Sequence, residues 1–265
     1  MQPIVSVITI SLNSENTIEN TIKSVLNQTY KNIEYIVIDG GSVDNTIRVI
    51  NKYSHAIAKI ISEKDKGIYD AFNKGLNISA GEYIQFVNSD DILDREKIAN
   101  CVHYMQRNPH TDIINGDLNM INSSGETYEI IKGKKPDFWT KLEMTGMNHP
   151  TYFVRTSVYN DHKFNMFRIG MDFDWTLRVI ASGHKFGYLA SNRVFMKYGG
   201  KSANDVFETM KEEYIISIIN GMSRPIALAF YYFQIIKKIV FNQMSRFIPI
   251  RWLYIFKRNK KHINL

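Results

Sequence analysis

The chain has 265 residues, with 44% hydrophobic and 22% charged residues, so we expect one large domain or two halves that share a core, and not a disordered or fibrous protein. A single cysteine, Cys101, excludes an internal disulfide bond and any zinc site built from cysteines. Together with a start that lacks the charged and apolar regions of a signal peptide, it favours a cytoplasmic location.

The net charge of +7 is unevenly distributed along the chain. All 26 acidic residues lie at or before Glu213, whereas residues 214–265 carry nine Lys and Arg. The tail is therefore +9, which leaves −2 on the rest of the chain. Aromatic residues lie between the charges of the tail, a combination typical of segments that bind an anionic membrane surface. We expect such a surface to bind residues 224–261 and expect no nucleic acid, although a nucleic-acid enzyme is the alternative use of this tail.

Apolar runs alternate with helical periodicity over the first 108 residues. The pattern predicts strands at 4–10, 33–38, 57–61 and 83–87, and helices at 17–26, 44–53, 69–77 and 95–107. The strands are almost continuously apolar, which is typical of a parallel sheet with helices on both faces. We therefore predict an α/β fold with a mostly parallel, Rossmann-like sheet.

The pattern is less regular after residue 110. It predicts a hairpin around 122–125, a strand at 152–154, a helix at 173–181, and strands near 186–189 and 194–198. Because no Gly-, Ser- or Pro-rich linker interrupts the chain, residues 1–108 and 109–212 are expected to be halves of one domain. Residues 213–265 are expected to form amphipathic helices that lie on a membrane without crossing it, since a span needs about 20 apolar residues.

Polar residues follow the carboxyl ends of all four strands predicted in the first half, where open parallel sheets bind ligands. They are Ser11, Asn13, Asp39, Glu63, Asp65, Asn88, Ser89, Asp90 and Asp91. For any single one of them, a turn or a helix cap is the better explanation. Three of the ends, however, bring carboxylates to one crevice, and these repel one another unless a cation neutralises them. Mg²⁺ or Mn²⁺ together with the phosphates of a ligand fits this pattern.

Several common nucleotide-binding motifs are absent from the sequence. No G-x-G-x-x-G follows the first strand, which argues against a dinucleotide-dependent dehydrogenase. Residues 200–202 read Gly-Lys-Ser, but Phe195 stands where a P-loop requires its first glycine. Cys101 falls within a predicted amphipathic helix, where it is expected to be a small core residue.

Four segments in order along the chain resemble the family 2 glycosyltransferases, which have the GT-A fold. They are residues 5–10, 38–46, 62–75 and 81–91, and residues 149–151, 171–175 and 198–202 resemble later elements of bacterial members that build cell-surface polysaccharides. The resemblance covers about residues 3–205. It implies an inverting, metal-dependent transfer of one sugar from a nucleotide sugar, a UDP-sugar, to a hydroxyl of a polyprenyl-diphosphate-linked or other glycan acceptor. Such an enzyme would act at the inner face of the plasma membrane.

The resemblance also implies roles for particular residues. Asp39 would contact a uracil base, Asp90 would ligate Mn²⁺ or Mg²⁺ with Asp91 beside it, and Asp172 would be the catalytic base. Asn88 and Met171 depart from the acidic residues usual at their positions. The whole predicted donor site consists of Ser11, Asn13, Asp39, Asp65, Lys66, Asn88, Ser89 and His149. Without the resemblance, Asp172 and Asp174 are equally well explained as helix N-terminal carboxylates, and Arg178 as the partner of a structural carboxylate.

Two other functions compete with this interpretation. Asn88 and Met171 favour a sugar-nucleotide-binding protein with impaired catalysis, although Asp90, Asp91 and Asp172 argue against it. Residues 243–247 resemble the Q-x-x-R-W element of processive polysaccharide synthases, with Phe247 in place of Trp. No apolar span of about 20 residues accompanies this element, so transfer of a single sugar is favoured.

Overall fold

The computed structural model describes residues 2–197 and 205–247, with the side chains described as far as residue 240. Residues 198–204, which include the predicted element at 198–202, lie outside the described residues. The same holds for the end of the basic tail at 248–265 and for the side chains of the 243–247 element.

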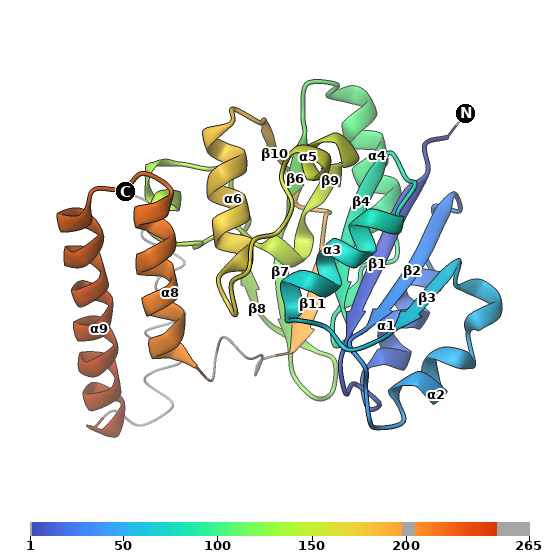
Figure 1. Ribbon diagram of the computed structural model, residues 1–265, viewed down its shortest axis with the longest axis horizontal. Helices are drawn as coiled ribbons and strands as arrows, with labels where there is room; N and C mark the ends of the chain where they lie inside the picture. The colour runs from blue at the N-terminus through green and yellow to red at the C-terminus, as the bar shows by residue number, and fades with distance from the viewer. Residues whose placement is uncertain (1, 198–204, 248–265) are drawn as a thin grey trace.

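A seven-stranded sheet forms the centre of the molecule, in the order β10-β6-β9-β4-β1-β2-β3 (Figure 1). The strands are β1 (Val5–Ser11), β2 (Ile33–Asp39), β3 (Lys59–Ser62), β4 (Tyr83–Asn88), β6 (Ile113–Asn115), β9 (Phe153–Arg155) and β10 (Phe186–Tyr188). All run parallel except β9, which is antiparallel to both β4 and β6. The predicted mostly parallel sheet is confirmed, and β4 and β9 join the two expected halves within it.

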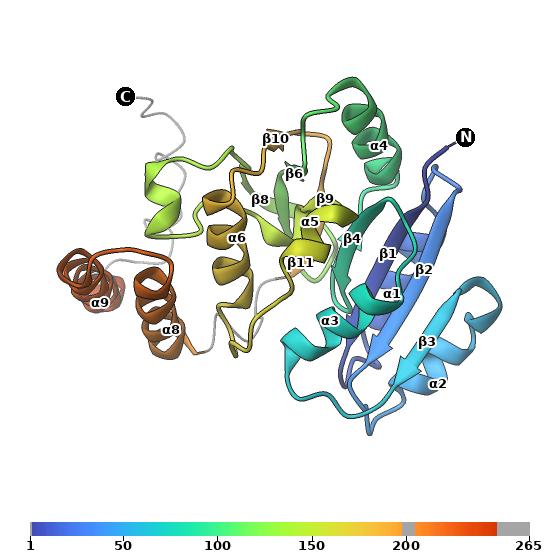
Figure 2. The ribbon, with the colours of Figure 1, turned by 45° about the horizontal axis from the view of Figure 1, so that its top comes forward.

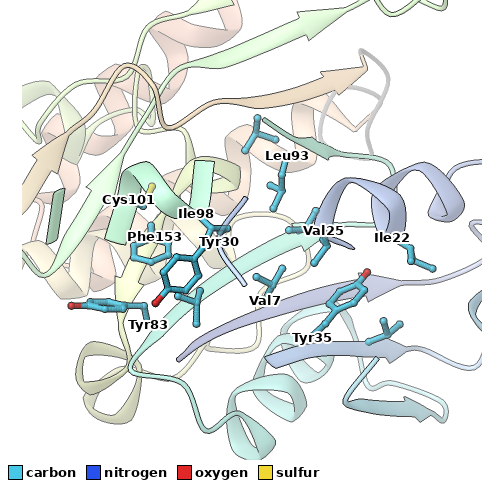
Figure 3. Close-up of a cluster of buried hydrophobic side chains, with 14 of the residues drawn as sticks. Val7, Ile22, Val25, Tyr30, Tyr35, Tyr83, Leu93, Ile98, Cys101 and Phe153 are labelled. Carbon is cyan, nitrogen blue, oxygen red and sulfur yellow. The ribbon is translucent and has the colours of Figure 1, made fainter. Parts of the chain in front are cut away.

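Helices cover both faces of this sheet. They are α1 (Ile18–Leu26), α2 (Thr46–Asn51), α3 (Ile68–Ile78), α4 (Lys97–Arg107), α5 (Thr156–Asp161) and α6 (Met171–Ala181). Side chains alternate between the faces along each strand, so Val7 packs with α1, α2 and α4, whereas Ile8 packs with α3, α5 and α6. Figure 3 shows the first cluster, where Cys101 is buried in the core, as predicted. Burial on both faces explains why the strands are apolar throughout.

A second, four-stranded sheet lies beside the first and also joins the two halves. Its order is β5 (Ile92–Leu93), β11 (Val194–Lys197), β7 (Leu118–Ile121) and β8 (Thr127–Ile131). The predicted hairpin around 122–125 connects β7 to β8, and Gly125 adopts the positive φ of 85° that its turn requires. The short strands β5 and β6 and the helix α5 were not predicted.

Two helices follow the domain at the end of the molecule away from β3 (Figures 1 and 2). α8 (Val206–Ile219) packs against α6, and α9 (Arg224–Phe247) packs against α8. The boundary expected between residues 212 and 213 falls inside α8, because it was placed where the acidic residues end and not where packing ends. In the part of the chain that is described, no helix is long and apolar enough to span a membrane.

Candidate functional site

The candidate site lies at the carboxyl ends of β1 to β4. In both ribbon views, α6 begins at this same end of the sheet (Figures 1 and 2). The loops that follow the strands supply most of the predicted donor-site residues, and the first turn of α6 supplies Asp172. The fold therefore brings two groups of predicted residues, far apart in the sequence, to one side of the molecule.

Asp39 ends β2 and organises the loop that follows it. Its Oδ2 accepts hydrogen bonds from the backbone N–H groups of Gly41 (3.1 Å) and Ser42 (2.9 Å) and from the hydroxyl of Ser62 (2.8 Å). Its Oδ1 accepts one from the Ser42 hydroxyl (2.5 Å). The carboxylate is fully buried and forms a turn. Its contact with a base stays a prediction, and Oδ1, which accepts a single hydrogen bond, is the oxygen with room for it.

Hydrogen bonds link the loops after β1, β2 and β4. Asn13, with a positive φ of 50°, accepts a hydrogen bond from the N–H of Val43 (2.9 Å) and donates its own N–H to the Ser42 hydroxyl (2.7 Å). The hydroxyls of Ser14 and Ser89 lie 2.6 Å apart. Ser11 is buried, and its hydroxyl has no hydrogen-bond partner among the described residues. These contacts fix the loops relative to one another before any ligand binds.

Asp65 follows β3 and is paired with a residue that the sequence analysis missed. Lys74 on α3 lies 2.7 Å from Asp65, 2.9 Å from Glu63 and 3.4 Å from Asp70. Burial raises the pKa of Asp65, although Lys74 opposes the shift. The pKa of Lys74 is raised overall. Burial by itself would lower it, but the carboxylate partners of Lys74 outweigh burial. The four-residue spacing from Asp70 to Lys74 was the available sequence signal.

Lys66 and Gly40 border the same loop. The side chain of Lys66 is exposed, and its backbone N–H donates to Asp70 (3.0 Å). A Cβ atom at position 40 would lie 2.6 Å from Oδ2 of Asp65, so only glycine leaves room for this carboxylate. Lys66 is therefore accessible to a ligand, whereas Asp65 is held against the loop after β2.

The two adjacent carboxylates after β4 face different surroundings. Asp90 is exposed, but Asp91 is only 1% exposed and its Oδ2 accepts a hydrogen bond from the Asn88 amide (3.0 Å). Burial, and then the charge of Asp90, raises the pKa of Asp91 to about 8, despite that hydrogen bond. At neutral pH the Asp91 carboxyl therefore holds a proton in this arrangement. The assignment of Asp91 as a metal ligand stays a prediction, and its burial argues against a direct contact.

The residues after β4 fit a metal ion that is held mainly by a ligand's phosphates. Among the described residues, no cluster of three or more His, Cys, Asp or Glu side chains could hold an ion by itself. Mg²⁺ and Mn²⁺ commonly bind through one or two carboxylates together with phosphates, and the exposed Asp90 can supply one. Oδ1 of Asp91 is buried without a hydrogen-bond partner in the described chain, and a cation held by Asp90 would favour the charged form of this carboxyl group without touching it.

His149 packs next to α6, the helix that carries Asp172, with 6.5 Å between its ring centroid and that of Trp175. His149 is 9% exposed and packs against the rings of Phe72 (5.9 Å between centroids) and Tyr152 (5.2 Å). Burial lowers its pKa, an effect that the carboxylate of Asp172 opposes. Its Nε2 atom is buried and lacks a hydrogen-bond partner within the described residues. Burial thus favours the neutral imidazole, which keeps one nitrogen without a partner in the described chain.

Buried polar contacts hold the short 3₁₀ turn that carries His149 (His149–Thr151). The ammonium group of Lys97 donates to the carbonyl oxygen of Thr151 (2.9 Å), and the side chain of Asn148 donates to that of Gly116 (2.8 Å). Lys97 is fully buried, and burial lowers its pKa to about 8. Sequence reasoning missed Lys97, because a lysine in a helix gives no sign that it points inward.

Asp174 and Arg178 form a structural pair, as the alternative explanation predicted. Asp174 is buried and accepts hydrogen bonds from Arg178 (2.9 Å), Asn165 (2.9 Å) and Asn220 (3.1 Å). Arg178 also donates to the carbonyl oxygen of Lys163 (2.7 Å). Asp172 differs from Asp174 in that its Oδ1 accepts only a local hydrogen bond, from the N–H of Phe173 (2.9 Å), in the described part of the chain.

The helix α8 brings two further carboxylates to this region. Glu212 contacts the loop before α6, and burial together with the charges of Asp172 and Glu143 raises the pKa of Glu213 to about 7. In the sequence analysis Glu213 marked only the end of the acidic part of the chain, and Glu212 was not singled out. Their position follows from the packing of α8 against α6, which no local pattern reveals.

Comparison with known proteins gives three informative matches. The sequence model of glycosyl transferase family 2 matches residues 6–168. The chain is 33% identical over 181 residues to an uncharacterized glycosyltransferase of Haemophilus influenzae, covering 61% of this chain and 54% of that protein. It is 42% identical over 106 residues to the UDP-Glc:alpha-D-GlcNAc-diphosphoundecaprenol beta-1,3-glucosyltransferase WfaP of Escherichia coli, covering 39% of this chain and 41% of that protein.

Among solved structures, S. aureus TarS 1-349 in complex with UDP superimposes with a TM-score of 0.64 at 21% identity. The match covers 86% of this chain and 69% of that one, and it shows a shared fold. The chain spans about half the length of the curated relatives that it matches.

Proposed function

The chain belongs to glycosyl transferase family 2 and has the predicted GT-A fold, and from this membership we propose that it transfers one sugar from a UDP-sugar to a hydroxyl of a lipid-linked glycan. The observation that carries the proposal is the placement of Asp172. Its charge acts on the pKa of the buried His149, and its helix begins at the end of the sheet where Asp90 is exposed. One end of the sheet thus offers a base and a carboxylate suited to a diphosphate-bound cation.

The loops after β1 to β4 are proposed to bind the nucleotide. Asp39 and Ser11 lie side by side at the ends of paired strands, and an acceptor such as Asp39 suits the ring N–H of uracil. The exposed side chain of Lys66 can approach phosphates. Support for UDP comes from WfaP, whose name specifies UDP-Glc, and from TarS, which was solved with UDP.

Asp90 is proposed to hold Mn²⁺ or Mg²⁺ together with the donor diphosphate. A bound ion of this kind neutralises the charge that develops on the departing diphosphate. Asn88 lacks the charge of the usual aspartate and donates its amide to Asp91. We therefore expect the chain itself to hold the ion weakly.

Asp172 is proposed to act as the general base. Its carboxylate accepts the proton of the acceptor hydroxyl while the hydroxyl oxygen forms a bond to the anomeric carbon of the donor. The bond from that carbon to the diphosphate breaks, and the nucleoside diphosphate leaves. Attack from the side opposite the leaving group inverts the configuration at this carbon.

The acceptor is proposed to be carried on a polyprenyl diphosphate at a membrane surface. The name of WfaP specifies a diphosphoundecaprenol acceptor. In this chain, α9 exposes apolar side chains, including Phe233 and Ile236, next to the exposed Lys237. We propose that residues 213–265 form a membrane-associating tail and that the protein binds the inner face of the plasma membrane peripherally.

The test is a screen of UDP- and GDP-sugars with Mn²⁺ that measures released nucleoside diphosphate, with Asp172→Asn and Asp90→Asn beside the unaltered chain. Asp172→Asn should keep UDP binding and lose turnover by about 100-fold or more, the usual scale for loss of a general base. Asp90→Asn should lose Mn²⁺-dependent UDP binding in calorimetric titration.

The matched control is Asp161→Asn, which removes an exposed carboxylate at the end of α5 and should change neither property. Full turnover in Asp172→Asn would contradict the assignment of the base. UDP binding without release of nucleoside diphosphate from any donor would instead favour the catalytically impaired alternative, and repeated addition of sugars would favour the processive one.

A further inference from the structure

Three backbone N–H groups immediately before α6 share one acceptor, the carboxylate of Glu212 on α8. Oε1 of Glu212 accepts a hydrogen bond from the N–H of Arg168 (3.0 Å), and its Oε2 accepts from those of Ile169 (2.8 Å) and Gly170 (2.8 Å). Bonds from N–H groups to a charged acceptor are stronger than those between neutral groups. A residue 42 to 44 positions further along the chain thus fixes the loop that leads into α6.

The start of α6 has no cap of its own. Gly170 occupies the N-cap position and offers no side chain to accept hydrogen bonds from the first turn. Its lack of a side chain also lets α8 approach, because a Cβ atom there would lie 2.6 Å from Cδ1 of Ile216. Glu212 therefore fixes the chain up to the N-cap residue, whereas within the first turn the N–H of Phe173 is bonded to Oδ1 of Asp172.

A second contact holds the same turn. Asn220, which follows α8, donates its side-chain N–H to Oδ1 of Asp174 (3.1 Å), and Asp174 lies in the first turn of α6. Glu212 thus contacts the residues just before Asp172, and Asn220 contacts a residue just after it. Between these contacts, Oδ2 of Asp172 has no hydrogen-bond partner in the described part of the chain.

We propose that Glu212 is a positioning residue for Asp172, an inference that rests on the function proposed above. By accepting hydrogen bonds from the amides of residues 168–170, Glu212 holds the chain that leads into the first turn of α6 and so keeps Asp172 in place. The second oxygen of Asp172 then remains available to the acceptor hydroxyl. Glu212 itself touches neither substrate nor the reacting atoms.

The first experiment compares the Glu212→Ala and Glu212→Gln variants of the full chain. We expect kcat to fall by about 10- to 100-fold in the Ala variant, the scale of a misplaced catalytic group, while the affinity for UDP stays unchanged. The Gln variant should lose less, because one amide oxygen can still accept from Ile169 and Gly170. The matched control, Glu208→Gln, removes an exposed carboxylate one turn earlier on α8 and should behave as the unaltered chain does.

The second experiment repeats Glu212→Gln in the Asp172→Asn background, which distinguishes positioning from a general loss of structure. If Glu212 acts through Asp172, the second substitution should add little to the first, because the two losses are not independent. An equal fold-loss in both backgrounds, or unchanged kcat in both Glu212 variants, would overturn the inference. Full turnover in Asp172→Asn alone would overturn the proposed base and the inference with it. The single variant Asp172→Asn therefore distinguishes a wrong catalytic base from a wrong role for Glu212.

Discussion

Glu213 shows how strongly the surroundings of one residue can alter its chemistry. It lines a pocket between α8 and α9 together with Tyr214, Phe230 and Tyr231. Burial is the largest cause that raises its pKa to about 7, and the charges of Asp172 and Glu143 add to the shift. The carboxyl group of Glu213 therefore ionises in the neutral pH range, whereas the carboxyl group of a glutamate in water ionises at a much lower pH.

This shift predicts a dependence of stability on pH. Because the pKa of Glu213 rises on folding from 4.5 to about 7, the folded state binds more protons than the unfolded state between these values, and the free energy of unfolding falls as pH rises through that window. Glu213→Gln should remove the dependence and be more stable than the unaltered chain at pH 8 by about 1–3 kcal/mol.

Urea unfolding at pH 5 and pH 8 measures the effect. The difference between Glu213→Gln and the unaltered chain should be small at pH 5 and largest at pH 8. Glu208→Gln, which removes an exposed carboxylate on the same helix, serves as the control. An equal difference at both pH values would mean that Glu213 does not titrate in this window.

At the residue scale, the sequence predicted which residues gather at the carboxyl ends of the strands better than what each of them does there. The strand-end rule picked out Asp39, Asp65, Asp90 and Asp91, and Asp39 forms a turn, the role expected of any single one of them, but the rule could not tell that Asp91 is buried. Burial depends on neighbours far away in sequence, and Lys74 and Glu212 were missed for the same reason. The resemblance, and not a local pattern, separated Asp172 from the structural Asp174.

At the scale of the element, α3 packs unusually close to the sheet. A Cβ atom at Gly75 would lie 2.5 Å from Cγ2 of Ile8 on β1 and 3.5 Å from Cγ1 of Ile38 on β2. α3 also carries Lys74, the partner of Asp65, and Phe72, which packs against His149. The close approach therefore positions side chains on both sides of the site.

Gly75→Ala should destabilise the protein by about 1–3 kcal/mol, because the added methyl group overpacks the interface between α3 and the sheet. In an open helix the same change stabilises, since alanine favours the helix more than glycine does. Asn77→Ala, at an exposed position of α3, is the control and should be neutral or stabilising by about 0.5 kcal/mol. Chemical unfolding measures both variants, and a more stable Gly75→Ala protein would contradict the close packing.

Prediction of the elements succeeded where a pattern was long and local. β1 to β4 and α1 to α4 were predicted within a few residues, because each of them contains its whole apolar run or helical period. β5 and β6 have two and three residues and exist only because β11 and β9 pair with them. Such strands could not be predicted from their own sequence, because they are too short to show the alternation of apolar and polar residues that marks a strand.

At the scale of the whole molecule, α9 presents an apolar side to the solvent. The exposed side chains recur at helical spacing and comprise Ile226, Leu228, Tyr232, Phe233, Ile236, Ile239 and Val240. Ala227 is buried on the opposite side, toward α8. An apolar side beside exposed cations is typical of helices that lie in a membrane interface.

We expect the double variant Phe233→Ser, Ile236→Ser to bind anionic liposomes at least about tenfold more weakly than the unaltered chain. Each buried side chain of this size contributes on the order of 1.5 kcal/mol, and about 1.4 kcal/mol corresponds to a factor of ten. Co-sedimentation at low and high salt measures the binding. The control is Val43→Ser, which removes an exposed apolar side chain from the loop after β2. Equal co-sedimentation of the double variant would show that this side of α9 is not the anchor.

The antiparallel strand β9 has a consequence for biosynthesis. Ile84 in the middle of β4 pairs with Val154 of β9, so the sheet of β1 to β4 emerges from the ribosome long before the strand that completes it. Until then, β4 presents an open row of backbone donors and acceptors to which any other extended chain can pair. The nascent protein is therefore most vulnerable to aggregation after β1 to β4 have formed and before residue 155 has left the ribosome.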